Sequence, residues 1–186
     1  MGEELRHKES SDLLATPIGD QDHVQGPATA PVTLLTYGDF ECPFSRQAAG
    51  HAKVLRAQYG DRLRFVFRHF PLTAKHPHAQ QAAEATEAAA SQGRFWEMAD
   101  LLFANQFHLD HEQLTQYAAR LGLDIRRFQH EVTGHTHAER IKTDVLSGKQ
   151  SGVTGTPTFF INGRRHDGSD DVSGLSAAIQ QALAKG

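Results

Sequence analysis

The strongest constraint on the fold is a run of strand, helix and strand, joined by short links, between residues 32 and 70. Residues 32–37 (VTLLTY) are apolar and rich in β-branched side chains, which is typical of a buried strand. A helical stretch follows over residues 43–59, and residues 63–70 (LRFVFRHF) alternate as a second strand. Because the links are short, this unit predicts two parallel strands connected by a right-handed crossover.

The middle of the chain is predicted to be entirely helical. Residues 79–90 are dominated by alanine, the best helix former, and apolar residues continue at helical spacing beyond them. Asp110 and Asp124 each precede a further amphipathic stretch and are predicted to be N-caps. The helical segment extends over about residues 76–150.

The C-terminal part returns to strands and ends in a helix. Residues 158–161 (TFFI) are predicted to form a strand. The Asn-Gly pair at 162–163 is the strongest short hairpin signal, with residues 164–167 as the return strand. Asp170 or Asp171 then caps the last helix. The predicted class is α/β, with an all-helical insertion between a βαβ half and a ββα half.

Length and periodicity predict one domain with an N-terminal extension. The chain has 186 residues, which is enough for one domain with a substantial core. Residues 1–17 show no periodicity, so we expect a flexible extension there and a folded domain over 18–186.

Composition excludes several functional classes. The formal charge of −3 gives no basic footprint for nucleic acid, and no apolar run approaches the length of a membrane span. The polar N-terminus has no apolar signal core, so we expect a cytoplasmic protein. The 12 histidines are scattered without zinc-finger spacing, and we interpret them as mostly surface residues and predict no metal site.

Cys42 is the only cysteine, and it lies where the first strand hands over to the helix. Pro43 suits the first helical position, so the free N–H groups and the dipole of the helix face the sulfur and stabilise a thiolate. We expect the Ser45 hydroxyl, one turn further on, to donate a hydrogen bond to the sulfur. Taken alone, this short pattern is more typical of a buried, inert cysteine than of a reactive one.

Five segments of the chain carry recognisable short sequences: DHVQGP at 22–27, GDFECPFS at 38–45, RHFPL at 68–72 with His76-Pro77, QGRFW at 92–96, and GTPTFFING at 155–163. Together they resemble the DsbA-like thioredoxin-fold proteins, in family order and over about residues 20–184. The most similar subgroup is the bacterial, cytoplasmic-type DsbA-like domains, some of which are fused to sodium/proton antiporters.

The resemblance implies a thioredoxin-like fold and a thiol–disulfide exchange site. In the family the usual motif is Cys-Pro-aromatic-Cys, so Ser45 stands where the second, resolving cysteine is expected. Pro157 is expected to be cis and to lie beside Cys42, and the backbone of Thr156 to pair with the substrate. Pro43 and Phe44 are expected to contact the substrate as well.

One sulfur cannot store a disulfide within the chain. The resemblance therefore implies that Cys42 forms mixed disulfides with protein or small-molecule disulfides and thiols, which an external thiol resolves. Such a site suits disulfide reduction, deglutathionylation or isomerisation. We expect no bound cofactor, with glutathione or another small thiol as a co-substrate.

Three further residues could influence the sulfur, and two other functions stay open. Asp39 and Glu41 could tune its ionisation or shuttle protons, although solvated loop acids are the simpler interpretation. His69, at the end of the second strand, is interpreted as a structural histidine.

The alternative functions are a redox-inactive peptide-binding or chaperone-like module, and a peroxide or thiol-stress sensor. Metal binding across a dimer through single cysteines is disfavoured.

Overall fold

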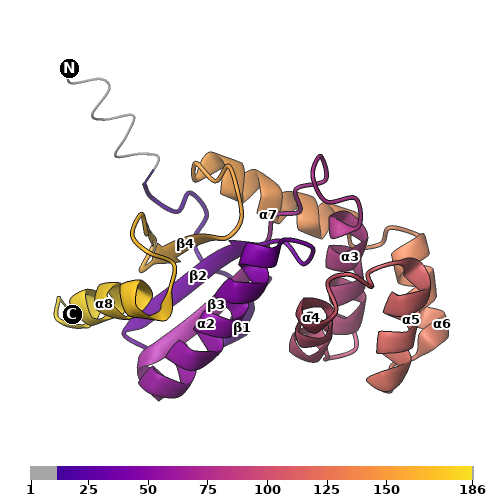
Figure 1. The fold of residues 1–186 in the computed structure, drawn as a ribbon, viewed down its shortest axis with the longest axis horizontal. Coiled ribbons are helices and arrows are strands. Elements are labelled where there is room, and N and C mark those ends of the chain that lie inside the picture. The colour runs from indigo at the N-terminus through magenta and orange to yellow at the C-terminus, as the bar shows by residue number, and fades with distance from the viewer. Residues whose placement is uncertain (1–11, 186) are drawn as a thin grey trace.

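A computed structural model describes residues 12–185 and shows a five-stranded mixed sheet beside a group of helices (Figure 1). The strands run in the order β1-β3-β2-β4-β5 across the sheet. The two longest strands, β2 and β3, are buried along most of their length, which agrees with their apolar sequences. The strands are β1 (His23–Gln25), β2 (Val32–Gly38), β3 (Leu63–His69), β4 (Thr158–Ile161) and β5 (Arg164–Arg165).

The strand–helix–strand prediction is confirmed. β2 and β3 pair in parallel, from Val32 opposite Leu63 to Gly38 opposite His69. They are connected through α2 (Pro43–Tyr59) and the short 3₁₀ turn η1 (Gly60–Arg62). β4 pairs antiparallel with β2, which places the segment before β4 beside the C-terminal end of β2.

The helical insertion is also confirmed. Most of it lies beside the sheet, whereas its last helix, residues 138–150, packs against the sheet (Figure 1). The predicted caps form, because Asp110 and Asp124 accept hydrogen bonds from the backbone N–H groups of Gln113 and Arg127. The small side chains of α3 let the other four helices of the insertion pack closely against it. The helices of the insertion are α3 (Ala79–Ala90), α4 (Phe95–Ala104), α5 (His111–Arg120), α6 (Ile125–Thr133) and α7 (Ala138–Gln150).

The C-terminal hairpin forms with a shorter return strand than predicted. Asn162 and Gly163 have φ of 48° and 77°, the left-handed conformation that a tight hairpin turn requires. The strand predicted over 164–167 comprises only β5, because the regular register with β4 ends at Arg165 and only the His166 N–H donates further, to Phe159 O. Asp171 then caps α8 (Val172–Leu183) by accepting from the N–H of Gly174.

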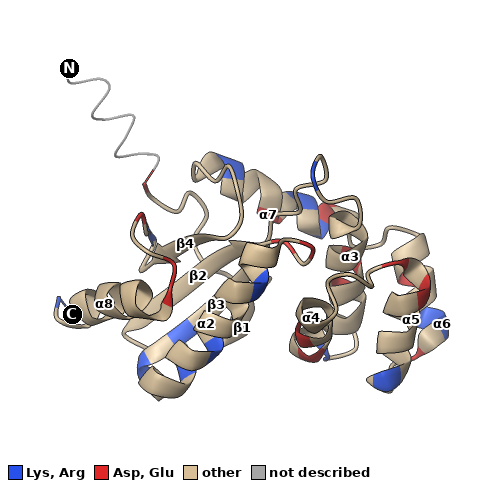
Figure 2. Cartoon of the chain, viewed as in Figure 1, with Lys and Arg blue, Asp and Glu red and all other residues tan. Residues whose placement is uncertain are grey.

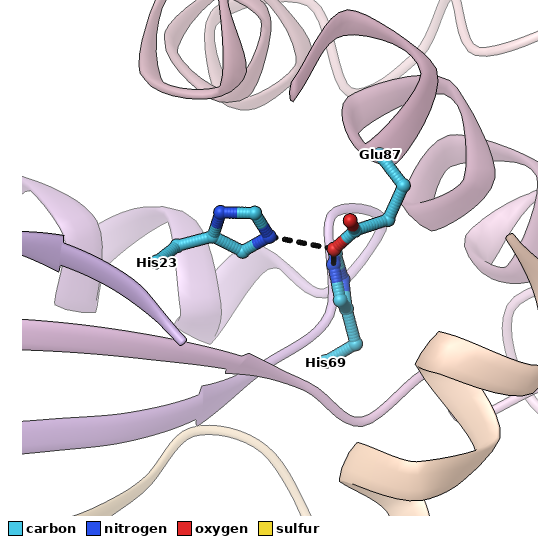
Figure 3. Close-up of side chains that lie close together, drawn as sticks. All are labelled: His23, His69 and Glu87. Carbon is cyan, nitrogen blue, oxygen red and sulfur yellow. Dashed lines mark hydrogen bonds and ion pairs between the residues drawn. The ribbon is translucent and has the colours of Figure 1, made fainter. Parts of the chain in front are cut away.

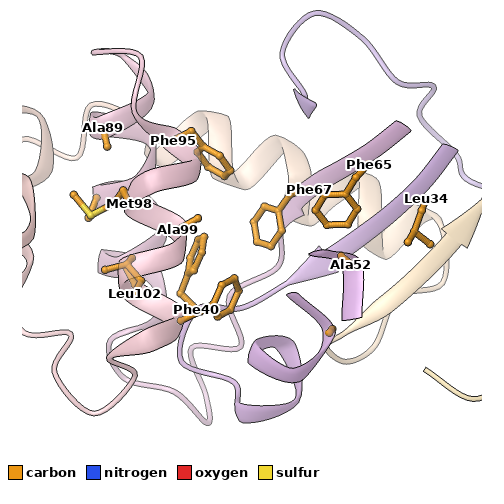
Figure 4. Packing of buried hydrophobic residues seen from close by; sticks show 14 of the residues in the cluster. Leu34, Phe40, Ala52, Phe65, Phe67, Ala89, Phe95, Met98, Ala99 and Leu102 are labelled. Carbon is orange, nitrogen blue, oxygen red and sulfur yellow. The ribbon is translucent and has the colours of Figure 1, made fainter. Parts of the chain in front are cut away.

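Side chains on opposite faces of the sheet enter two separate cores, as the alternation along strands requires. One face, with Phe65 and Phe67, packs on α2, α8 and the insertion. Figure 4 shows the rings of Phe40, Phe67 and Phe95 filling the space between the sheet and α4. The other face holds a smaller cluster of Leu35, Tyr37, Val66, Phe70, Val153 and Phe160.

Residues 12–17 depart from the predicted flexible extension. Leu13 forms a bridge with Arg164, and the Leu14 N–H donates to the Gly163 carbonyl at 2.8 Å. The buried Arg68 guanidinium donates to the carbonyl oxygens of Thr16 and Pro17. The folded unit therefore begins before residue 18, because polar backbone groups of this segment complete the sheet and a buried charge. Residues 1–11 lie outside the described part.

None of the helices in residues 12–185 is both long and apolar enough to cross a membrane.

Candidate functional site

Cys42 is the N-cap residue of α2, immediately before the helix begins at Pro43. Its Sγ donates to the Thr156 carbonyl oxygen at 3.4 Å, and the Thr156–Pro157 peptide bond is cis. β2 and β4 are antiparallel neighbours, with Tyr37 opposite Thr158. The loop that follows β2 and carries Cys42 therefore meets the loop that precedes β4 and carries Thr156. Cys42 is only 3% exposed.

Ser45 does not play the part expected for it. It is buried one turn into α2, and its Oγ accepts a hydrogen bond from the Asp39 N–H at 3.2 Å. Among the hydrogen bonds of residues 12–185, none joins Ser45 to the Cys42 sulfur. The reason is that Cys42 directs its sulfur across to the Thr156 carbonyl instead.

Asp39 and Glu41 lie in the acidic loop just before α2 (Figure 2), but their carboxylates bind another loop. The buried Asp39 accepts from the N–H groups of Glu41 and Leu72 and pairs with His76 Nδ1 at 2.7 Å. Glu41 accepts from the His78 N–H at 2.6 Å and pairs with His78 Nδ1. The contacts described for both carboxylates therefore anchor the Cys42 loop to residues 72–78, rather than reaching the sulfur.

Gln106 is a site residue that the sequence analysis missed. Its Nε2 donates to the carbonyl oxygens of Phe40 and Cys42, each at 2.8 Å, from the loop between α4 and α5. The insertion thus holds the Cys42 loop directly. A single glutamine 64 residues from the cysteine carries no sequence signal for this contact.

Two exposed aromatic side chains border this region. Phe44, next to Pro43 in the first turn of α2, is 63% exposed. Phe107 directly follows Gln106 and is 91% exposed. On the other side of the sulfur, Thr156 Oγ1 is buried without a hydrogen-bond partner in the described residues. Apolar rings and an unused polar group beside a cysteine can bind an extended peptide.

His69 is a buried, paired histidine, as interpreted from the sequence. Its Nε2 lies 2.7 Å from Glu87 Oε1, and His23 Nε2 lies 2.6 Å from the same oxygen (Figure 3). Burial alone would raise the pKa of the Glu87 carboxyl, but the hydrogen bonds from both histidines outweigh it and hold that pKa far below its usual range. Glu87 is therefore ionised at neutral pH.

Curated relatives match nearly the whole chain but are much longer. The chain is 50% identical over 173 residues to the protein named Na(+)/H(+) antiporter NhaA 3 of Salinispora tropica, covering 93% of this chain and 26% of that protein. It is 44% identical over 169 residues to Na(+)/H(+) antiporter NhaA of Herminiimonas arsenicoxydans, covering 90% of this chain and 27% of that protein. The chain thus spans about a quarter of the length of these relatives.

Solved structures share the fold over almost their full length. BdbD from Bacillus subtilis superposes with a TM-score of 0.77 at 19% identity, covering 93% of this chain and 98% of that one. DsbA2 of Pseudomonas aeruginosa has a TM-score of 0.70 at 27% identity, covering 91% and 98%. A family profile described as Thioredoxin matches residues 19–181. Because this profile covers most of the chain, the chain belongs to the thioredoxin family.

Proposed function

We propose that the chain exchanges thiols and disulfides through Cys42 alone. The observation that carries this proposal is the placement of a single sulfur at the N-terminus of α2, facing Thr156 beside the cis bond to Pro157. The N-terminus of a helix is a position at which reactive cysteines occur in proteins. Ser45, one turn away, offers no second sulfur.

The exchange takes place in two balanced steps. The Cys42 thiolate attacks one sulfur of a substrate disulfide, whose S–S bond breaks, and the departing thiolate takes a proton from water. An external thiolate, for which glutathione is the proposed co-substrate, then attacks the mixed disulfide. It restores the Cys42 thiolate and carries the substrate sulfur away as a new disulfide. Such thiols are abundant in the reducing cytoplasm, where we propose that the chain acts.

The surroundings of Cys42 favour protein disulfides as substrates. A substrate strand can pair with the backbone at Thr156 once the contact between its carbonyl and the Cys42 sulfur opens. The exposed ring of Phe44, in the same turn as Pro43, offers apolar contact area to neighbouring substrate side chains. The proposal concerns only the part of the antiporter relatives that this chain matches.

The test is incubation with oxidised glutathione followed by mass spectrometry of the intact chain. We expect one stable glutathione adduct in the wild-type protein and none in Cys42→Ser. In Ser45→Cys, a second sulfur one turn away should displace the glutathione, so that the adduct no longer accumulates. If the wild-type protein takes up no adduct, or if Ser45→Cys accumulates it equally, the proposed exchange is wrong.

A second candidate, a peptide-binding module without redox chemistry, is favoured by the low exposure of Cys42 next to the exposed Phe44 and Phe107. It predicts that Cys42→Ala leaves the affinity for a labelled unfolded peptide unchanged, whereas Phe44→Ser weakens it. Loss of binding in Cys42→Ala would argue against this candidate, and the glutathione experiment separates it from exchange.

A further inference from the structure

Three ionisable side chains from distant parts of the chain converge on one buried point. His23 comes from β1, His69 from the end of β3 and Glu87 from α3 (Figure 3). Both imidazole Nε2 atoms point at the same oxygen, Glu87 Oε1, and the three candidate ligand atoms all lie within 4.8 Å of one another. We propose that His23, His69 and Glu87 form a binding site for a divalent transition metal ion, with Zn²⁺ as the best fit.

The donor set is one that such ions use. Two imidazole nitrogens and one carboxylate oxygen occur as a three-residue set in zinc sites that keep a fourth position open, and in non-haem iron sites. Tetrahedral zinc with bonds of about 2.0–2.1 Å places its ligands about 3.3 Å apart. The Nε2–Oε1 distances of 2.6 and 2.7 Å therefore need to open by only about 0.6–0.7 Å.

The protonation states suit metal binding. The carboxylate of Glu87 is ionised, and burial lowers the pKa of His23 despite its hydrogen bond to Glu87, so this imidazole is neutral at pH 7. A neutral imidazole can move its proton to Nδ1 and offer the Nε2 lone pair to a metal ion. A metal ion would then take the place of the His23 N–H as a partner of the Glu87 carboxylate.

The rings are already held in place by packing. His23 stacks on Phe95, with ring centroids 3.4 Å apart and planes 6° apart. His69 lies edge-on to Phe67 at 5.4 Å and next to Phe40 at 5.9 Å. His69 and Glu87 are 1% and 7% exposed, and His23, at 14%, provides the more open side. Preoriented ligands in an apolar shell bind metal ions more tightly, because less freedom is lost on binding.

A metal ion here would connect the two halves of the fold. It would fix β1 and β3 of the sheet to α3 of the insertion. His69 also contacts the ring of Phe40, which lies in the loop that leads to Cys42. The proposal is independent of the exchange chemistry, because it does not involve the Cys42 sulfur.

The experiment titrates the full chain with Co²⁺ and Zn²⁺ after treatment with a chelator. Because a thiolate also binds these ions, the parent protein for all measurements carries Cys42→Ser. We expect one Co²⁺ per chain with the visible absorption of a four-coordinate site, displaced by Zn²⁺. A 100-fold excess of Zn²⁺ over its Kd should raise the Tm by about 5–10 °C.

Matched variants locate the ion. Glu87→Gln keeps the size of the side chain but removes the charge, and His23→Asn removes the more exposed imidazole. Each should weaken Zn²⁺ binding at least about 10-fold. Losing even a residue that only hydrogen-bonds to a metal ligand lowers metal affinity about 10- to 100-fold, so the loss of a ligand itself should cost no less. His135→Asn removes an exposed histidine that pairs with Glu84, outside the cluster, and should leave binding unchanged.

Three results would overturn the proposal. The first is that the parent protein binds no Co²⁺ and shows no rise in Tm with Zn²⁺. The second is that binding persists in both cluster variants. If these variants fail to fold, X-ray absorption of the Zn²⁺-loaded parent protein identifies the ligands instead. The third refuting result is then a spectrum that shows a ligand set other than two imidazoles with oxygen.

Discussion

Replacing Gln106 with alanine removes the side chain whose Nε2 donates to the carbonyl oxygens of both Phe40 and Cys42. The two carbonyl groups are not affected equally. Cys42 O still accepts from the Arg46 N–H at 3.2 Å, whereas no other donor in the described residues reaches Phe40 O. The substitution therefore leaves one buried acceptor without a partner.

The loss of stability in Gln106→Ala can be calculated from this one unsatisfied carbonyl and the side-chain atoms that are removed. A buried, unsatisfied carbonyl costs about 1–3 kcal/mol, and the lost methylene of the side chain adds about 0.8 kcal/mol. We expect Gln106→Ala to lower the free energy of unfolding by about 2–4 kcal/mol. The same change releases the loop that ends at Cys42, so iodoacetamide should modify the sulfur faster.

A matched variant, Gln106→Glu, tests whether donation is what matters. Its carboxylate would face two carbonyl oxygens, so folding would favour the protonated acid and raise its pKa above the unfolded value of about 4.3. The loss of stability should be complete above the raised pKa and should largely disappear below about pH 4.3.

Urea denaturation followed by circular dichroism, repeated between pH 3.5 and 8, measures both effects. If Gln106→Ala lies within about 0.5 kcal/mol of the wild type, or if the deficit of Gln106→Glu does not change with pH, the inferred role of these hydrogen bonds is refuted.

Three further substitutions, one in a buried ion pair and two at glycines, are tested by the same denaturation assay. Burial would raise the pKa of Asp22, but hydrogen bonds from Arg68 and the Gly19 N–H hold that pKa below its usual value. The Asp22–Arg68 pair therefore stabilises the protein fully above about pH 3.9, and this stabilisation is lost as the pH falls through the folded pKa. Asp22→Asn should therefore cost about 3–5 kcal/mol at pH 7 and less in acid, and a constant difference would contradict this reasoning. A Cβ at Gly148 would lie 2.8 Å from carbons of the Phe70 ring, so Gly148→Ala should cost about 1–3 kcal/mol. Gly50→Ala, in an open position of α2, should instead stabilise by up to about 1 kcal/mol, and equal effects at both glycines would refute the steric argument.

The parts of the fold that local pattern encodes were predictable. The β2–α2–β3 unit, the helical insertion and the Asn-Gly hairpin each follow from periodicity or turn chemistry within a short stretch. β1 was missed because a three-residue strand has too little pattern of its own and forms by pairing with β3, some 40 residues away. Residues 12–17 were misjudged for the same reason, since their partners, Arg164 and Arg68, are distant in the chain.

The site shows the same division between local and distant information. The position of Cys42 at a helix N-terminus was readable, because Pro43 opens a helical stretch a short loop after the strand that ends at Gly38. The place of the Thr156–Pro157 segment beside Cys42 was expected only from the family resemblance, because it depends on the pairing of β2 with β4, which no local pattern encodes. The partners of Asp39 and Glu87 and the reach of Gln106 also depend on packing between elements, which a single sequence does not encode locally.

The short edges of the sheet have a consequence for association between chains. An unpaired strand edge is a template on which another chain can add a strand and begin to aggregate. Here the outer strands β1 and β5 are only three and two residues long, and Leu13 bridges to Arg164 on β5. Residues 12–14 thus cover the β5 edge of the sheet. The sheet therefore presents little unpaired backbone on which fibrils could nucleate.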